Sequence, residues 1–168
     1  MSKSDRLLNR KRLFGEHPIR IEDDTEAREG VEQAQFALAL LRTQGDAADE
    51  GALRSAKASL TRAKKKLRAC YEWIPLRAME VDAFEELVGK HKPRPETSDE
   101  VWNNETFPKA CLLACDESGR SEADWEHIFK SVLNGPEQVE LCNTAIRVNA
   151  RTPDESLPKG WAQTSNSA

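Results

Sequence analysis

Aromatic residues are scarce in this 168-residue chain, which has one tyrosine, four tryptophans and five phenylalanines. Because aromatics make up only 6%, leucine, alanine and valine must supply most of the packing in the core. Hydrophobic residues account for 38% and charged residues for 32%, so we expect a modest core and a heavily charged surface. The length fits one domain or two very small ones.

Long apolar stretches are missing as well. No run of apolar residues approaches the length needed to cross a bilayer. The opening residues, MSKSDRLLNRKRLFGEH, are basic but contain neither the apolar stretch nor the small-residue cleavage site of a secretion signal. We therefore expect a cytoplasmic protein without membrane contact, whose four cysteines are reduced thiols.

Recognisable catalytic patterns are absent too. The chain has no phosphate-binding loop of the GxxxxGK kind, and no glycine-rich turn precedes a cysteine. None of the histidines, His17, His91 and His127, stands in a motif-like setting. We therefore expect no enzymatic activity, no catalytic residues and no cofactor.

The spacing of two cysteines raises the question of a metal site. Cys111 and Cys115 are four residues apart on a predicted helix, and with His127 or Cys142 they could surround a zinc ion. The spacing differs from that of the common CxxC pair, and no second short-spaced pair of ligands exists. Since both cysteines sit among alanines and leucines, we expect buried thiols and no metal.

The two halves of the chain differ in charge. Residues 1–70 carry 15 Lys and Arg against 11 Asp and Glu, whereas residues 71–168 carry 10 against 18. A basic front and an acidic back suit a protein that docks with an oriented partner or with copies of itself.

Hydrophobic spacing predicts a mostly α fold with a minor two-stranded β element. Apolar side chains recur at helical spacing in residues 25–44, and leucines fall seven apart in residues 52–70. We expect these helices to form an antiparallel hairpin, flanked by paired strands at 18–21 and 70–76. The facing residues are then Val31, Leu38 and Leu41 on the first helix and Leu53, Leu60 and Leu67 on the second.

Four segments follow from these patterns. Residues 1–17 form a basic N-terminal arm, and residues 18–76 hold the short strand, the helical hairpin and the return strand. Residues 77–150 form an acidic bundle of short helices, interrupted by a loop over 90–100 and containing a capping box at Ser121–Asp124. The tail, residues 151–168, is expected to be disordered or ordered only on a partner.

A basic run lies on the second helix of the predicted hairpin. It comprises Lys57, Arg62, Lys64, Lys65, Lys66 and Arg68. The run could contact phosphates, but it also fits the solvated back of an amphipathic helix with cations near its C-terminus. Because no aromatic or recognition-helix residues are interleaved with these charges, we do not favour nucleic acid as the partner.

From Tyr71 onward, the order of short motifs is similar to that of a known family. The segments are YEWIPLRAM, AFEELVGKHKPRPE, VWNNETFPKACLLACDES, SEADWEHIF, LNGPEQVELCNTA and IRVNA. In this order they resemble the tail assembly chaperones, or short tail assembly proteins, of long-tailed bacteriophages and prophages of actinobacterial type. The resemblance covers most of residues 18–150, while Glu72 and Pro75 depart from the regular strand of the family and Lys92-Pro93 from its paired prolines.

The resemblance implies a non-catalytic chaperone that binds the tape measure protein and keeps it soluble during tail tube assembly. It also implies the cytoplasm of the bacterial host as the location, and it leaves self-association open. A structural component of the tail or virion remains an alternative, as does a nucleic-acid-binding adaptor that uses the helix with Lys64, Lys65 and Lys66. The chaperone role is physically reasonable, because short amphipathic helices can hold an apolar helix in a groove.

Two tryptophans are the predicted contacts for the partner. Trp102 lies in a polar segment with no helical period to carry it inward. Trp125 follows the acidic residues Glu122 and Asp124 in a first helical turn, a place usually near solvent. Since tryptophan is enriched among binding anchors, we predict that Trp102 and Trp125 help to hold the partner helix.

Overall fold

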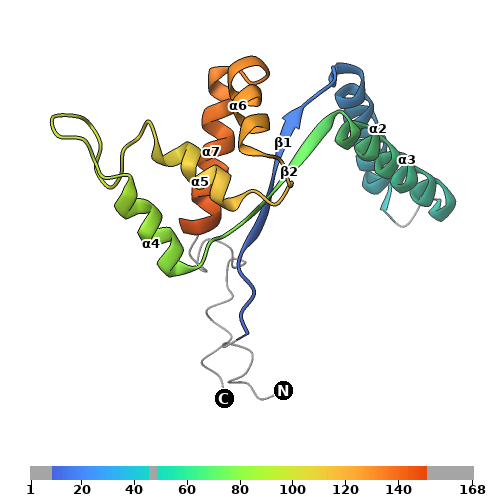
Figure 1. Ribbon diagram of the computed structural model, residues 1–168. Coiled ribbons are helices and arrows are strands. Elements are labelled where there is room, and N and C mark those ends of the chain that lie inside the picture. Colours follow the sequence, from blue (N-terminus) through green and yellow to red (C-terminus); the bar gives the residue numbers. More distant parts are fainter. Residues whose placement is uncertain (1–8, 46–48, 151–168) are drawn as a thin grey trace, which may run out of the picture. The chain divides into compact units, whose positions relative to one another are not determined.

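The computed structural model describes residues 9–45 and 49–150 (Figure 1). Within these ranges the chain forms six helices and one two-stranded antiparallel sheet, which confirms the predicted mostly α fold with a minor β element. No helix in the described ranges combines the length and the apolar character that crossing a membrane requires. The predicted tail, residues 151–168, lies outside the described residues.

The two strands are β1 (Phe14–Arg20) and β2 (Tyr71–Arg77). The pairing was predicted, but β1 begins at Phe14 and not at Pro18, so residues 14–17 belong to the strand and not to the basic arm. Neither a β-branched residue nor a clear alternation marks Phe14 to His17. This stretch becomes a strand because it lies beside the apolar end of β2, which shows how strongly strand formation depends on the neighbour.

Two hydrogen bonds fix the register of the sheet. Ile21 N donates to Cys70 O (2.9 Å), and Ala78 N donates to Leu13 O (2.9 Å). In this antiparallel register every second residue points its backbone N–H away from the partner strand, and Pro75 stands at such a position. Pro75 therefore removes no hydrogen bond from the ladder, and the strand stays regular through it.

The chain divides into two compact units, and the boundary falls inside both strands. One unit, called here the hairpin unit, is Pro18–Trp73. The other, called here the helical unit, consists of Met1–His17 together with Ile74–Ala168.

The hairpin unit contains α2 (Thr25–Thr43) and α3 (Glu50–Ala69), which pack against each other as the leucine spacing predicted (Figure 1). On α2, Val31 and Leu38 are buried. The expectation that the leucines of α3 are buried is only partly right, because α3 has no fully buried residue and Leu53, Leu60 and Leu67 are half-exposed. Two helices alone cannot enclose a core, so the seam between them stays partly open to solvent.

A buried carboxylate ties α2 to β2 within the hairpin unit. Asp24, whose side chain is only 4% exposed, accepts hydrogen bonds from Tyr71 Oη and Arg28 Nε, and it pairs with Arg20 Nη1 at 3.6 Å. These donors hold the pKa of Asp24 below its ordinary value, with the Tyr71 hydroxyl as the largest cause. The charge is thereby compensated, as a buried carboxylate requires.

The helical unit contains α4 (Val81–Lys90), α5 (Phe107–Cys115), α6 (Glu122–Ser131) and α7 (Gly135–Ala150). The predicted capping box is confirmed, since Ser121 N donates to Asp124 Oδ2 (2.9 Å) and Asp124 N donates to Ser121 Oγ (3.2 Å). Pro108 stands in the first turn of α5, where its missing N–H costs nothing.

The core of the molecule lies mainly in the helical unit. α5 packs on α7, and β2 adds two aliphatic side chains from the adjoining strand. The largest fully buried side chains are Trp125, Phe107, Ile74, Leu76, Leu112, Leu141, Cys111 and Cys115.

Candidate functional site

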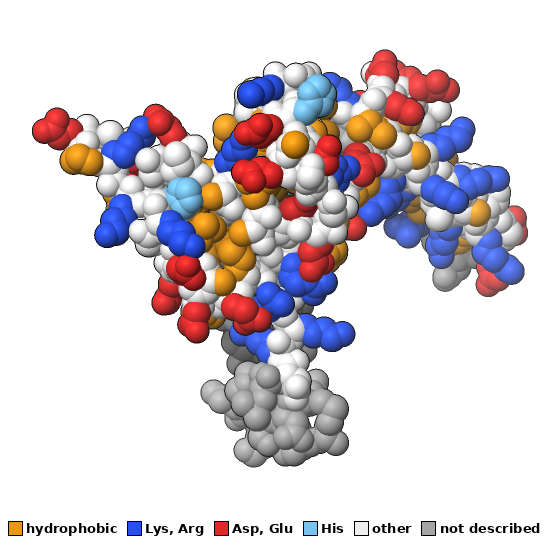
Figure 2. Space-filling model, in the orientation of Figure 1, with side chains coloured by type: hydrophobic (Ala, Val, Ile, Leu, Met, Phe, Trp, Pro, Cys, Tyr) orange, Lys and Arg blue, Asp and Glu red, His pale blue; other side chains and the backbone are white. Residues whose placement is uncertain are grey.

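An apolar groove opens on the helical unit between α5, α6 and α7, with Trp102 at one side. We call it the Trp102 groove, and it has a volume of ≈ 520 Å³. Its apolar lining consists of Trp102, Pro108, Phe129, Val139, Cys142 and Ile146, and its polar lining of Asn104, Glu105, Lys109, Gln138 and Asn143. The surface elsewhere is dense in charged side chains, as Figure 2 shows for one face of the molecule.

Trp102 is held in place from behind by a fully buried ring. Its indole stacks on Phe107 with ring centroids 4.4 Å apart and an interplanar angle of 23°. Phe107 is in turn contacted edge-on by Phe84 (5.9 Å) and His91 (6.2 Å). Because one face of the indole is packed and the side chain is half-exposed, Trp102 offers a rigid apolar surface to the groove.

The loop that carries Trp102 is fixed by a buried ion pair. Asp99, whose side chain is 1% exposed, accepts from Arg94 Nε (2.9 Å), from Arg94 N (3.2 Å) and from Asn104 N (3.2 Å). The Arg94 guanidinium holds the pKa of Asp99 well below its usual range. Arg94 also pairs with Glu105 at 2.5 Å, so the segment predicted as a loop has a defined shape.

The opposite wall of the groove is set by the corner between α6 and α7. Gln138 Nε2 donates to Phe129 O (2.7 Å) and to Leu133 O (2.9 Å), two carbonyls at the end of α6. Lys109 places its ammonium 5.0 Å from the centre of the Phe129 ring. Val139 is 57% exposed, and the other exposed residues of the lining are the polar Asn104 and Glu105.

Both Trp102 and Trp125 were predicted to contact the partner, but their side chains lie in different surroundings in the structure. Trp102 lines the groove, whereas the premise for Trp125 is wrong, because its side chain is only 1% exposed. Its indole N–H donates to Asp116 Oδ2 (2.9 Å), which satisfies the polar end of the ring within the fold. A side chain without exposed surface has nothing to offer a partner, so Trp125 is left out of the candidate site.

The cysteines of α5 form a buried pair next to α7. Asn149 Nδ2 donates to Cys115 Sγ (3.1 Å) and lies 3.7 Å from Cys111 Sγ, and all four cysteines of the chain are free and buried. A hydrogen bond from Cys111 lowers the pKa of Cys115, against the opposing effect of burial. At 0% and 1% exposure, neither sulfur can reach a substrate.

The candidate metal ligands differ in their surroundings. His127 is exposed on α6, whereas Cys111, Cys115 and Cys142 are buried. Over residues 9–45 and 49–150, no group of three or more His, Cys, Asp or Glu side chains is arranged to hold a metal ion.

The other two histidines are bonded to threonine hydroxyls. His91 Nδ1 lies 2.8 Å from Thr106 Oγ1, and His17 Nδ1 lies 2.8 Å from Thr144 Oγ1. Burial lowers the pKa of His17, opposed by the charge of Glu140. Neither interaction brings a histidine to a cysteine, so a Cys–His nucleophile is not assembled by these contacts.

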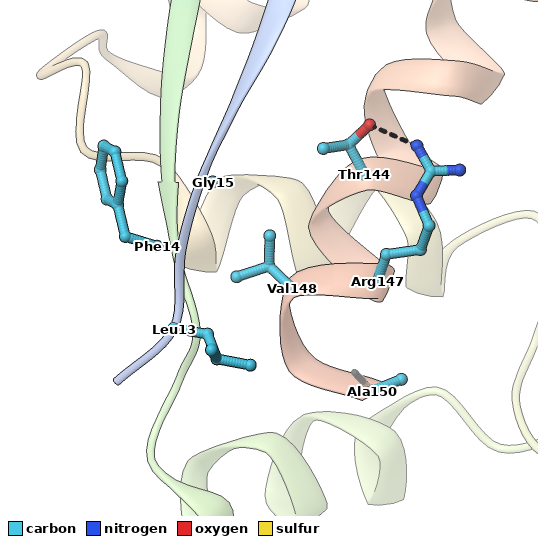
Figure 3. A pocket seen from close by; sticks show the side chains of 7 residues that line it. All are labelled: Leu13, Phe14, Gly15, Thr144, Arg147, Val148 and Ala150. Carbon is cyan, nitrogen blue, oxygen red and sulfur yellow. Dashed lines mark hydrogen bonds between the residues drawn. The ribbon is translucent and has the colours of Figure 1, made fainter. Parts of the chain in front are cut away.

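A second groove of the helical unit lies between β1 and α7 (Figure 3). It has a volume of ≈ 490 Å³, and its lining consists of Leu13, Phe14, Gly15, Thr144, Arg147, Val148 and Ala150. In Figure 3, Val148 points toward the strand while the ring of Phe14 points away from α7. The side chains facing this groove are therefore few and mostly small, and it offers no aromatic anchor comparable to Trp102.

Comparison with known proteins gives no matching family model, no matching curated protein and no matching solved structure. The resemblance to tail assembly chaperones therefore stays a prediction that rests on the order of the motifs.

Proposed function

We propose that this protein is a tail assembly chaperone that binds an apolar helical segment of the tape measure protein and carries out no catalysis. The observation that carries the proposal is the Trp102 groove, which has a volume of ≈ 520 Å³, a mostly apolar lining and an aromatic side chain at one side. The order of motifs from Tyr71 onward supports the same assignment.

The geometry of the groove suits an amphipathic helix. Large side chains at positions i, i+3 or i+4, and i+7 of such a helix project from one face and can fill a groove between helices. Trp102 is already ordered by its stacking on Phe107, so little conformational entropy is lost when a partner packs against it. The polar rim, which includes Glu105 and Lys109, sets the orientation of the bound segment.

The first test places a charge at the mouth of the groove. Val139→Asp should abolish co-purification with the tape measure protein of the same phage genome, because a carboxylate would be desolvated on binding. The matched control is Val81→Asp, which changes an exposed valine outside the groove in the first turn of α4. Equal binding by both variants would refute the assignment of this groove.

The second test removes the anchor. Trp102→Ala should weaken binding to the tape measure protein by roughly thirtyfold, the effect of about 2 kcal/mol expected for a central aromatic anchor. Thermal melting of the free variant checks that the fold survives.

Mass spectrometry of purified phage particles separates a chaperone from a structural tail component. A chaperone should be absent from the particle. Stoichiometric amounts in the particle would instead favour the structural role and contradict the proposal.

A further inference from the structure

The outward face of α3 carries a continuous row of cations. α3 contains seven Lys and Arg against one acidic residue, Glu50, and none of its side chains is buried. At 3.6 residues per turn, five of these cations fall on a single face of the helix. They are Arg54, Lys57, Lys64, Lys65 and Arg68. The row extends over roughly 21 Å along the helix axis, from the rise of 1.5 Å per residue.

Three lysines of this row form no ion pair with the residues that the structure describes. Arg54 pairs with Glu50 at 3.2 Å, but no residue in the described ranges forms an ion pair with Lys57, Lys64 or Lys65. In Figure 2, blue side chains gather over the part of the hairpin unit that contains α3, whereas red ones lie over the upper end of α2. Such a row concentrates positive potential on one side of the hairpin unit.

The fold joins this row to an aromatic pair. The Arg68 guanidinium lies 3.9 Å from the centre of the Trp73 ring, and Trp73 Nε1 donates to Arg68 O (3.3 Å). The Tyr71 ring follows at 6.5 Å from Trp73. Along α3 itself no aromatic residue stands among the charges, which disfavoured nucleic acid as a partner. The contact between Arg68 and Trp73 supplies an aromatic side chain from the neighbouring strand.

These aromatic side chains are placed to receive a flat ligand. Trp73 and Tyr71 are both half-exposed, and the hydroxyl of Tyr71 is held by Asp24 and Arg28. A tryptophan beside a stacked arginine is a surface on which an unpaired base can stack. An acidic peptide would satisfy the lysines but has no flat base for Trp73.

We propose that the hairpin unit binds single-stranded nucleic acid on this basic-aromatic face, defined by Lys57, Lys64, Lys65, Arg68 and Trp73. The lysines contact consecutive phosphates, and one base stacks on Trp73 beside the Arg68 guanidinium. Paired bases are hidden in a duplex, so the single strand is the form that uses both parts of the face. This inference goes beyond the chaperone role and rests on none of the residues of the Trp102 groove.

The first experiment measures the anisotropy of fluorescent oligothymidylate and oligouridylate against the full chain over a series of salt concentrations. The double variant Lys64→Gln/Lys65→Gln should bind more weakly and reduce the slope of log K against log salt by about 1.4, or 0.7 for each lost phosphate contact. The matched control is Lys92→Gln/Lys130→Gln, which removes two exposed lysines of the helical unit. An equal loss in both double variants would overturn the proposal.

The second experiment tests stacking. Trp73→Leu should weaken binding about tenfold, whereas Trp73→Phe should keep most of the affinity, because phenylalanine preserves a flat face. Circular dichroism melting checks the fold, and the lysine variants keep the test decisive if Trp73→Leu does not fold. Tighter binding of one oligonucleotide identifies RNA or DNA as the source, and either result supports the proposal.

Two further results would overturn it. One is the absence of binding to both oligonucleotides at low salt. The other is displacement of the oligonucleotide by polyglutamate together with unchanged binding by Trp73→Leu, which would assign the face to an acidic protein. Neither result would affect the tests on Val139 and Trp102, so the two proposals fail separately.

Discussion

The hairpin unit and the helical unit differ in how much apolar surface they bury. Among the described residues of the hairpin unit, three hydrophobic ones are buried, namely Val31, Leu38 and Cys70, and the other described buried hydrophobic residues belong to the helical unit. On α2, Phe36 and Leu40 are 72% and 55% exposed, one turn apart on the same helix. The hairpin unit therefore gains little from apolar burial, and its polar network around Asp24 carries a larger share of its structure.

Because of this difference, the exposed surface of each unit depends on its core to a different degree. A helix without a buried residue, such as α3, is free to devote its surface to charge, because substitutions there disturb no core. In the helical unit the opposite holds, since Trp102 can be presented to a groove only because Phe107 behind it is fully buried. The two units thus offer two kinds of surface, one electrostatic and one apolar.

The largest effect should come from Trp125, compared with Trp102 of the same unit. Trp125→Ala should lower the free energy of unfolding by about 3–5 kcal/mol, because it empties a fully buried site and removes one of the hydrogen-bond donors to Asp116. Trp102→Ala should cost far less stability, since its side chain is half-exposed. Urea denaturation of both variants measures the difference, and equal losses would mean that Trp102 is a core residue.

The same substitution at one leucine in each unit compares the two cores directly. Leu141→Ala in α7 should cost about 2–5 kcal/mol, because Leu141 is fully buried. Leu60→Ala in α3 should cost only about 1 kcal/mol, since its side chain is already partly exposed to water. If hydrogen exchange of the hairpin unit shows a loss for Leu60→Ala as large as that for Leu141→Ala, the contrast in core strength is wrong.

Two glycines should respond in opposite directions to the same change. A Cβ at Gly15 would lie 2.9 Å from Val148 Cγ2, so Gly15→Ala should destabilise the helical unit by about 1–3 kcal/mol. At Gly30, within α2, nothing lies within 4 Å of the added carbon. Gly30→Ala should stabilise the hairpin unit by about 0.5–1 kcal/mol through helix propensity. Denaturant midpoints give the sign of the change in stability for each variant. A stabilising Gly15→Ala would contradict the close packing of β1 on α7.

The smallest effect is a difference in pH dependence. Thr144 donates its hydroxyl proton to Glu140 O (2.8 Å), so it accepts from His17 Nδ1, with Arg147 donating to the same oxygen. Burial lowers the pKa of His17 below its ordinary 6.5, so the native state disfavours the imidazolium. The stability of the helical unit should therefore fall as the pH drops through 6.5, where the unfolded chain takes up the proton first.

The hairpin unit should respond only at lower pH. The pKa of Asp24 is lowered from its ordinary 3.8, so the stabilisation that it gives is present above 3.8 and is lost as the pH falls below that value. Hydrogen exchange across a pH series reads the two units separately. In His17→Gln the change near pH 6.5 should disappear from the helical unit, and its persistence would assign the effect to another group.

The helices were predictable because each has a local signature. Ser121 and Asp124 form a reciprocal cap that can be read from four residues, and the leucine repeat of α3 follows from spacing alone. The beginning of β1 was not predictable, because Phe14 to His17 become a strand only through their partner. Local chemistry therefore predicted the helices, and tertiary pairing decided the strand.

In the candidate site, too, local sequence predicted some features and tertiary contacts decided others. Trp102 lines the groove with a half-exposed side chain, and its role as a contact for a partner stays a prediction. Trp125 was misread, yet Ile128 and Phe129 follow it at helical spacing and could have marked it as part of an apolar face. The contact between Arg68 and Trp73 depends on the turn from α3 into β2, and only their closeness in the sequence hinted at it.

The two prolines of the sheet limit how it can be used. Pro18 on β1 and Pro75 on β2 both stand where the backbone faces away from the partner strand, and Pro75 O is already taken by Glu117 N (3.0 Å). Pro18 has no N–H to offer, so a foreign strand aligned along β1 would meet a missing donor in the middle of its ladder. The ribbon is therefore protected against edge-to-edge growth and aggregation, a hazard for any short exposed sheet at high concentration.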